Sequence, residues 1–368
     1  MKKWLALILA MLMLLSCIGC GGQTSENGSA ENSGSSSSSD TASQDSDKVY
    51  KIAFSIPVAA APYWTAVGWG VHKEVEAINE EAGQTVIEYQ FFNPGNFELE
   101  TQLKNIEDAI SLGVDGMILA PVDSNGTVPA IENAAAEGIP ICTVDLQAET
   151  DVILAGFCTY NYEAGVTAAE TMAELINEKN GAYEGTVALN MGKANISSHV
   201  ARVQGFKDTM AEKYPDIEIV FEQFADVSED NLTVIEDALA QYADLDAVFT
   251  TGDTAADMAC QAIDGAGRFK EIGDPDHIIV VGFDGEINGL LNIRNGRQDA
   301  TVAQNPVIMG EMAARTIYEY LTEGTVPDVD EDGQIEVPHF AITYKNIDTD
   351  EAAEYFWAEE VDEIDISF

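Results

Sequence analysis

Short apolar runs and longer amphipathic stretches alternate along the chain. Residues 51–56 form a short, mainly apolar run, and the apolar residues between Val67 and Ile78 then recur every three or four positions before Gly83. A short apolar run is typical of a buried strand, a three-to-four-residue period of an amphipathic helix, and a following glycine of a helix end. Further strands are predicted over 86–92, 116–120 and 139–144, and further helices over 103–110 and 128–136.

The same rhythm begins again after Asn161. Helices are predicted over 161–176, 201–212, 232–242 and 255–263, and strands over 186–190, 217–223, 247–251, 278–281 and 300–303. A repeat of about 30 residues is that of a strand-helix-strand unit, whose strands are parallel and buried on both faces. Because the body, 48–368, is longer than one hydrophobic core supports, we predict the α/β class with two doubly wound parallel-sheet lobes.

The N-terminal residues have the pattern of an export signal. Two lysines precede an unbroken apolar run, 4–15, which is shorter than the roughly 20 residues that a membrane span needs. The pattern resembles a bacterial lipoprotein signal, in which a cysteine becomes the lipidated first residue of the mature chain. We assign the signal to 1–20 and lipidation to Cys20, because two glycines follow it. Cys17 is the alternative lipidation site, and a secreted protein without an anchor is the other alternative.

Composition separates a tether from the body and limits its partners. Residues 21–47 contain no aliphatic or aromatic residue larger than alanine, so we expect a disordered tether there. The formal charge of −47, from 64 acidic and 17 basic residues, excludes a nucleic-acid-binding surface, which needs clustered Lys and Arg. It also disfavours attraction to anionic lipid. We therefore expect a monomer that a lipid anchor holds on the outer face of the bacterial cell membrane.

Three cysteines remain after the signal, and they do not form a disulfide framework. Cys142 and Cys158 each lie in a strand-like run and could be neighbours, and Cys260 lies in a predicted helix. We expect all three to be buried free thiols.

Polar and aromatic residues gather just after predicted strands, where open α/β sheets bind ligands. They are, in chain order, Tyr63, Trp64, Asp123, Asp145, Arg202, Asp253, Asp284 and Gln304. Aromatic rings, carboxylates and one arginine suit a sugar, whose hydroxyls donate to acids and accept from a guanidinium while its C–H faces lie on rings. Asp123 and Asp253 precede helices and are expected to be helix N-caps. The alternative for Tyr63 and Trp64 is packing of the first helix onto its sheet.

At these residues the body resembles a known family. The motifs that carry the resemblance are APVDS (120–124), GIPI (138–141), TVD (143–145), RVQGF (202–206), VFTTGD (248–253), VGFDG (281–285) and ATVAQ (300–304). From Lys48 to about Tyr344 the chain resembles the ribose-type periplasmic sugar-binding proteins, the solute receptors of ABC importers. The resemblance implies a type I periplasmic-binding-protein-like fold, with no enzymatic activity and no required cofactor.

The resemblance also implies a domain division and a motion. A three-strand hinge would cross near Thr159, Gln304 and Val337. The N-terminal lobe would comprise 48–159 with 305–337, and the C-terminal lobe 160–304 with 338–368. Hinge closure driven by the ligand is the motion expected of such lobes. A sugar or polyol and an ABC transporter permease are the implied partners.

Carried over residue by residue, the family's site falls on six of the residues above. The resemblance implies stacking rings at Tyr63 and Trp64, hydroxyl acceptors at Asp145 and Asp284, a second-lobe arginine at Arg202 and a crossover glutamine at Gln304. Four positions depart from the family pattern: Ala61 and Gly252 replace asparagines, Leu146 an arginine and Val227 an aromatic residue. These departures imply a sugar or polyol other than free ribose.

An acidic loop near the C-terminus is a candidate calcium site. Oxygen-bearing side chains alternate at Asp328, Asp330, Asp332, Gln334 and Glu336, with a glycine at the sixth position, as in the opening of an EF-hand loop. His339 stands at the twelfth position, where a bidentate Glu would be required. A calcium ion would need a remote carboxylate, and a solvated acidic loop is the alternative.

Other functional classes fit the sequence less well. A transcription regulator of this fold would need a DNA-binding helix-turn-helix and a basic surface, and a glycosidase would need paired carboxylates at a scissile bond, for which Asp145 and Asp284 are the candidates. His199 is expected to be an exposed helix residue or to border the site. The nearer alternative to transport is a receptor that passes its bound state to a membrane sensor kinase.

The lipid anchor gives a direct prediction. Replacing Cys20 by Ala should release the protein from the cell surface, because no thiol remains at the assigned lipidation site. Detergent-phase partitioning of the two single variants measures this. Retention of Cys20→Ala together with release of Cys17→Ala would move the anchor to Cys17.

Overall fold

The chain is described by a computed structural model over residues 48–58, 61–92, 95–225 and 230–362. The predicted signal, the tether, Cys20 and Val227 lie outside these residues. Within the described residues, none of the helices is both long enough and apolar enough to cross a membrane.

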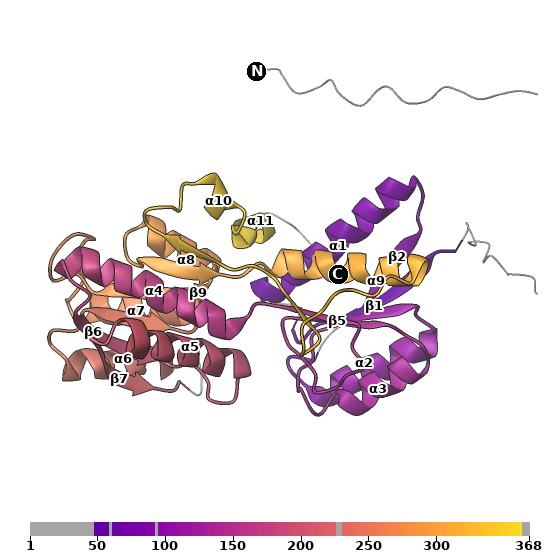
Figure 1. Cartoon of the computed structure of the whole chain (residues 1–368), viewed down its shortest axis with the longest axis horizontal. Helices are drawn as coiled ribbons and strands as arrows, with labels where there is room; N and C mark the ends of the chain where they lie inside the picture. The colour runs from indigo at the N-terminus through magenta and orange to yellow at the C-terminus, as the bar shows by residue number, and fades with distance from the viewer. Residues whose placement is uncertain (1–47, 59–60, 93–94, 226–229, 363–368) are drawn as a thin grey trace, which may run out of the picture. The chain divides into compact units, whose positions relative to one another are not determined.

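The first lobe is built on a six-stranded sheet with the strand order β11-β5-β4-β3-β1-β2, all pairs parallel. Its strands are β1 (Tyr50–Ser55), β2 (Ile87–Phe91), β3 (Gly116–Leu119), β4 (Ile141–Val144), β5 (Ala155–Cys158) and β11 (Gln334–Glu336). Its helices are α1 (Pro62–Ala82), α2 (Leu99–Leu112), α3 (Val128–Ala136) and α9 (Pro306–Glu323). Core contacts place α1 and α9 on one face of the sheet and α2 and α3 on the other (Figure 1).

The second lobe repeats this plan with the strand order β12-β10-β9-β8-β6-β7. Its strands are β6 (Gly185–Asn190), β7 (Ile217–Gln223), β8 (Ala247–Thr250), β9 (Ile279–Asp284), β10 (Ala300–Ala303) and β12 (Phe340–Thr343). Its helices are α4 (Asn161–Asn180), α5 (Ser197–Lys213), α6 (Asp230–Gln241), α7 (Asp253–Gly265), α8 (Ile287–Arg294) and α10 (Asp350–Ala353), and α11 (Trp357–Asp362) follows. β12 is antiparallel to β10, and the other pairs are parallel.

These arrangements confirm the predicted fold class. The chain passes between the sheets three times: after β5, between β10 and α9, and between β11 and β12. The predicted helix over 128–136 and strands over 217–223 and 300–303 match the structure, and most other boundaries move by a few residues. The elements α8, α9, α10, α11, β11 and β12 were not predicted.

Local sequence explains where the first helix begins and ends. Pro62 occupies the first turn of α1, where its missing N–H costs no helical hydrogen bond. Gly83 ends the helix with a left-handed φ of 68° and donates its N–H to the carbonyl of Glu80. That conformation is accessible to glycine without a Cβ penalty. The N-terminus of α1, which carries Tyr63, is thereby fixed at the carboxyl end of β1.

Each lobe contains one close helix pair that depends on glycine. A Cβ at Gly70 of α1 would lie 1.9 Å from the carbonyl oxygen of Val307, and one at Gly310 of α9 would lie 2.2 Å from that of Val67. The second lobe uses Gly165 of α4 in the same way, where a Cβ would lie 2.2 Å from the carbonyl oxygen of Arg202. Backbone therefore meets backbone at both crossings, which brings α1 close to α9 and α4 close to α5.

The three cysteines of the body are free and buried, as predicted. Burial raises the pKa of the Cys158 thiol to about 12. The Cys158 thiol donates to the side-chain oxygen of Gln334 at 2.9 Å. These thiols are structural, because a buried protonated thiol is a poor nucleophile.

The α1–α9 crossing gives a stability prediction. Gly70→Ala should lower the free energy of unfolding by about 2 to 4 kcal/mol, because the added methyl group must displace the backbone of Val307. Urea unfolding followed by circular dichroism measures the loss. The matched control is Gly265→Ala, since a Cβ at this helical glycine meets no atom within 4 Å. Equal stability of the two variants would contradict the proposed close crossing.

Candidate functional site

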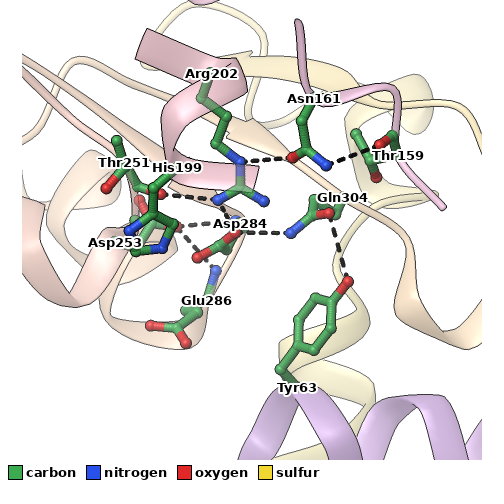
Figure 2. Close-up of polar contacts among 12 residues, drawn as sticks. Tyr63, Thr159, Asn161, His199, Arg202, Thr251, Asp253, Asp284, Glu286 and Gln304 are labelled. Carbon is green, nitrogen blue, oxygen red and sulfur yellow. Dashed lines mark hydrogen bonds and ion pairs between the residues drawn. The ribbon is translucent and has the colours of Figure 1, made fainter. Parts of the chain in front are cut away.

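Five of the six predicted site residues form one hydrogen-bonded chain. Asp284 ends β9, Gln304 follows β10, Asp145 follows β4, Tyr63 lies in the first turn of α1, and Arg202 lies in α5. Figure 2 shows Arg202 and Gln304 converging on Asp284, with Tyr63 approaching Gln304 from α1. Sequence reasoning placed these residues at strand ends, and the structure brings them together.

Arg202 is the central cation of the site. Its side chain is 4% exposed, and its Nη1 donates to the Asp284 carboxylate at 2.9 Å and to the carbonyl of Thr251 at 2.8 Å. Its Nε donates to Asn161 at 2.8 Å, and the guanidinium lies 3.7 Å from the centre of the Phe283 ring. A buried charge needs such partners, because its desolvation costs several kcal/mol. The guanidinium therefore has a fixed orientation before any ligand arrives.

Gln304 and Tyr63 continue the chain toward Asp145. The Gln304 amide nitrogen donates to Asp284 at 2.7 Å, and the Tyr63 hydroxyl lies 3.4 Å from the Gln304 oxygen. The same hydroxyl donates to Oδ1 of Asp145 at 2.7 Å. Burial first, and the Asp145 carboxylate second, raise the pKa of Tyr63 well above its ordinary value. The phenol therefore remains a proton donor at neutral pH.

The two predicted acceptors share an unusual backbone conformation. Asp145 has φ of 58° and Asp284 has φ of 97°, both on the left-handed side that residues with a Cβ rarely adopt. Such backbone costs on the order of 1–3 kcal/mol, persists only where surrounding contacts hold it, and concentrates at functional sites. Burial raises the pKa of the Asp145 carboxyl above its ordinary value, although the hydrogen bond from Tyr63 acts in the opposite direction. The backbone conformation at both aspartates is therefore unfavourable in itself, which is consistent with a role of both residues in binding.

Trp64 differs from Tyr63 in its surroundings. Its side chain is 7% exposed and packs within the first-lobe core, with its ring edge-on to Tyr63 at 5.4 Å and to Phe97 at 6.5 Å. Tyr63 is partly buried and also meets the ring of Trp357 edge-on at 5.7 Å. Packing of α1 onto its sheet accounts for the position of Trp64, and its stacking on a ligand stays a prediction.

The two aspartates expected to be N-caps do not cap the following helices. The Asp123 carboxylate accepts from the amides of Asn125 and Gly126, in the turn before α3. Asp253 is fully buried at the start of α7, and its Oδ2 accepts from the amides of Gly285 and Glu286, each at 2.9 Å. The N-cap positions themselves are Thr127 and Gly252.

Asp253 instead holds the loop that carries Asp284. Besides the two loop amides, its carboxylate accepts from the Thr301 hydroxyl at 2.9 Å and from Gln298 at 2.8 Å. Burial raises its pKa well above the ordinary value. Its four donors and its complete burial explain why it supports the site without being available to a ligand.

Sequence reasoning missed Glu286, which follows the Asp284-Gly285 pair. Its carboxylate accepts from the Thr254 hydroxyl at 2.9 Å. Burial, followed by the Asp284 carboxylate, raises its pKa to about 7. The sequence feature that could have identified Glu286 is its position two residues after Asp284, which ends a strand.

His199 is partly buried, in contrast to the exposed helix residue expected. Its Nδ1 accepts from the amide of Lys193 at 3.0 Å, and Figure 2 shows it beside the second-lobe residues of the site. Burial, and then the Arg202 charge, lower its pKa to about 3. His199 therefore stays neutral at physiological pH.

One of the departures from the family pattern affects the space around the Asp284 carboxylate. A Cβ at Gly252 would lie 3.1 Å from Oδ2 of Asp284, so glycine keeps that oxygen uncovered. Leu146 packs at the margin of the first-lobe core, as does Ala61. The arginine described in the site, Arg202, pairs with the Asp284 carboxylate.

The candidate calcium loop is stabilised by its own hydrogen bonds. Oδ1 of Asp330 accepts from the amides of Asp332 and Gln334, and its Oδ2 accepts from the Tyr160 hydroxyl. Gln334 and Glu336 belong to β11. Among the residues that the structure describes, no group of three or more His, Cys, Asp and Glu side chains is arranged to hold a metal ion. Calcium at this loop stays a prediction.

The arrangement suits recognition of hydroxyl groups. Within the described part of the chain, the hydrogen bonds to Asp145 and Asp284 fall on Oδ1 of each residue, so each Oδ2 can accept from a ligand. Arg202, Gln304 and Tyr63 supply donors fixed in place by these bonds. A separate cavity of about 650 Å³ is lined by Lys73, Asn305 and Trp357 among others, and by none of the six predicted site residues.

Comparison with known proteins agrees with this geometry. A model of the periplasmic binding protein domain matches residues 52–325. A ribose import binding protein of Bacillus subtilis (strain 168) is 30% identical over 275 residues, 74% of this chain and 82% of that protein. A xylitol-binding protein of Mycolicibacterium smegmatis is 27% identical over 260 residues, 70% of this chain and 69% of that protein.

A solved structure extends the likeness to three dimensions. The ABC transporter solute-binding protein from Agrobacterium vitis with bound D-fucose is 27% identical, has a TM-score of 0.67, and is matched over 83% of this chain and 99% of that one. These matches confirm the ribose-type resemblance and the prediction of a binding protein rather than an enzyme. The chain belongs to the periplasmic binding protein family.

Proposed function

We propose that this protein is an extracytoplasmic receptor that binds a monosaccharide or polyol and delivers it to an ABC transporter permease. The family supports extracytoplasmic sugar binding in import. The observation that carries the proposal is the preset carboxylate pair. Arg202 and Gln304 donate to Asp284, and Tyr63 donates to Asp145, so the chain's own residues fix both carboxylates.

The ligand class follows from the balance of donors and acceptors. Two carboxylates accept from neighbouring hydroxyls, while Arg202 and Gln304 donate to ring or hydroxyl oxygens. Leu146 supplies no guanidinium after Asp145, so the site offers fewer donors than the ribose-type pattern. We expect a neutral sugar or polyol most of whose contacts are hydroxyl groups that donate to the carboxylates, with fewer oxygens that accept from Arg202 and Gln304. We expect D-ribose to bind weakly.

The location and partner complete the proposal. Lipidation at Cys20 and the tether of 21–47 would keep the body near the membrane-embedded permease. A closed pair of lobes would be the form presented to that permease. The chain works as a monomer in this scheme, since one copy contains all six proposed binding residues.

A thermal-shift screen tests the ligand class. D-ribose, D-fucose, xylitol, myo-inositol and D-allose are added to the body, and a compound that binds only the folded state raises stability by about 2.7 kcal/mol at a hundredfold excess over its Kd. At least one compound other than D-ribose should raise the melting temperature. Submicromolar affinity for D-ribose would contradict the specificity assigned to Leu146.

Substitution at Asp284 tests the site itself. Asp284→Asn keeps a residue that tolerates left-handed backbone but replaces a ligand-facing acceptor, which costs roughly 1 to 3 kcal/mol. Affinity for the panel compound with the largest shift should fall by about 10- to 100-fold in isothermal titration. The matched control is Asp123→Asn, since Asp123 also follows a strand and bonds only its own turn among the described contacts. Equal losses in both variants would place the site elsewhere.

Glu286 gives a pH prediction for the unliganded protein. Its folded pKa of about 7 lies above its ordinary 4.5, so the protonated form is favoured by folding. Its contribution to stability is complete below about pH 4.5 and is lost as pH rises through about 7. The loss is roughly 1 to 3 kcal/mol, less than the full shift because the carboxyl keeps part of its exposure.

The measurement is urea unfolding of the wild type and of Glu286→Gln from about pH 4.5 to 8. The stability of the wild type relative to the variant should decline with rising pH. Parallel pH profiles would show that Glu286 titrates at its ordinary value.

A further inference from the structure

The C-terminal segment brings a buried tryptophan to the back of the proposed site. Trp357 begins α11 and is 2% exposed. It packs with Ala66 of α1 and Val307 of α9, and Tyr63 and Ile287 lie against this cluster. The match to the family model ends at residue 325, before Trp357.

Trp357 holds the backbone of Asp284. Its indole Nε1 donates to the Asp284 carbonyl oxygen at 3.1 Å, and the amide of Gln304 donates to the same oxygen at 3.2 Å. Asp284 has φ of 97°, a conformation that persists only when neighbouring groups hold it. The indole therefore supplies one of the two described donors to the carbonyl oxygen of this strained residue.

The same indole ring contacts the proposed binding residue of the first lobe. The rings of Trp357 and Tyr63 meet edge-on, with centroids 5.7 Å apart at 89°. Edge-to-face pairs at this distance are favourable. On its other side Tyr63 meets Trp64 at 5.4 Å and 85°. Tyr63 is thus held between two indoles while its hydroxyl bonds Asp145.

The segment that carries Trp357 is itself fastened at several points. The side-chain amide of Asn305 donates through its Nδ2 to the backbone carbonyl of Glu354 at 3.1 Å. The ring of Tyr355 stacks on Phe340 at 5.3 Å, and Arg294 pairs with Glu359. The segment that carries Trp357 is therefore held in place by contacts of its own, in addition to those of Trp357 with Tyr63 and Asp284.

We propose that Trp357 is a positioning residue for ligand binding, which fixes Tyr63 and Asp284 together through one indole. This inference rests on the proposed function, since both partners are proposed binding residues. Trp357 is 2% exposed and is not one of the six proposed binding residues, so its effect on binding passes through the backbone of Asp284 and the ring of Tyr63.

The first test needs no ligand. Trp357→Phe keeps an aromatic ring for packing but removes the donor to Asp284. Amide hydrogen exchange should rise at least threefold at Gln304, whose N–H shares the Asp284 carbonyl, and at Thr65, whose N–H bonds the carbonyl of Ala61 at the start of α1. The matched control is Tyr355→Leu, which weakens the same segment at Phe340 and should lower the melting temperature without changing exchange at Gln304.

The second test measures affinity for the panel compound that gives the largest thermal shift with the wild type. Trp357→Phe should weaken binding by about fivefold, the effect of one lost hydrogen bond, while Tyr355→Leu should bind as the wild type does. Unchanged exchange or unchanged affinity in Trp357→Phe overturns the inference. If no panel compound binds the wild type, the proposed ligand class fails, and the exchange experiment alone decides the role of Trp357.

Discussion

The buried ion pair of Arg202 and Asp284 is the interaction on which the site depends. Desolvating a guanidinium costs several kcal/mol, and this cost is offset only when its donors are satisfied. Asn161, Thr251 and Asp284 satisfy them, and the Phe283 ring covers one face. Thr251 follows β8 and Asp284 ends β9, so these two strands must end at matching positions for Arg202 to reach both acceptors. The register of the second sheet therefore determines the geometry of the site.

A second buried polar residue, Asp253, holds the loop next to this ion pair. Asp253 receives four hydrogen bonds in full burial and fixes the loop that follows Asp284. Removing one partner of such a network leaves the others unsatisfied, which costs more than the net value of the bond. A ligand then meets groups whose orientation was settled during folding, and less ordering entropy is lost on binding.

Sequence patterns predicted most of the fold because buried parallel strands are short apolar runs between amphipathic helices. The strand-end residues Asp145 and Asp284 were predictable for the same reason, since topology alone places them at one edge of each sheet. Helix α9 was missed although Pro306 and Gly324 bound it. The role of Asp253 could not be predicted, because its donors come from residues 32 to 48 positions away. Trp357 was missed because an isolated aromatic residue near a chain end carries no periodic signal.

The left-handed backbone at Asp145 and Asp284 restricts how ligand preference can change over evolution. Glycine and asparagine can replace an aspartate in such a conformation, whereas valine, isoleucine or threonine would clash with their own backbone. Ala61 and Gly252 instead have extended backbones that any residue can adopt. Selection for a new ligand therefore has few workable substitutions at the carboxylates and many at their neighbours. Descendants of this protein should keep the acidic pair while the flanking positions diverge, which is the pattern that Ala61, Leu146 and Gly252 already show.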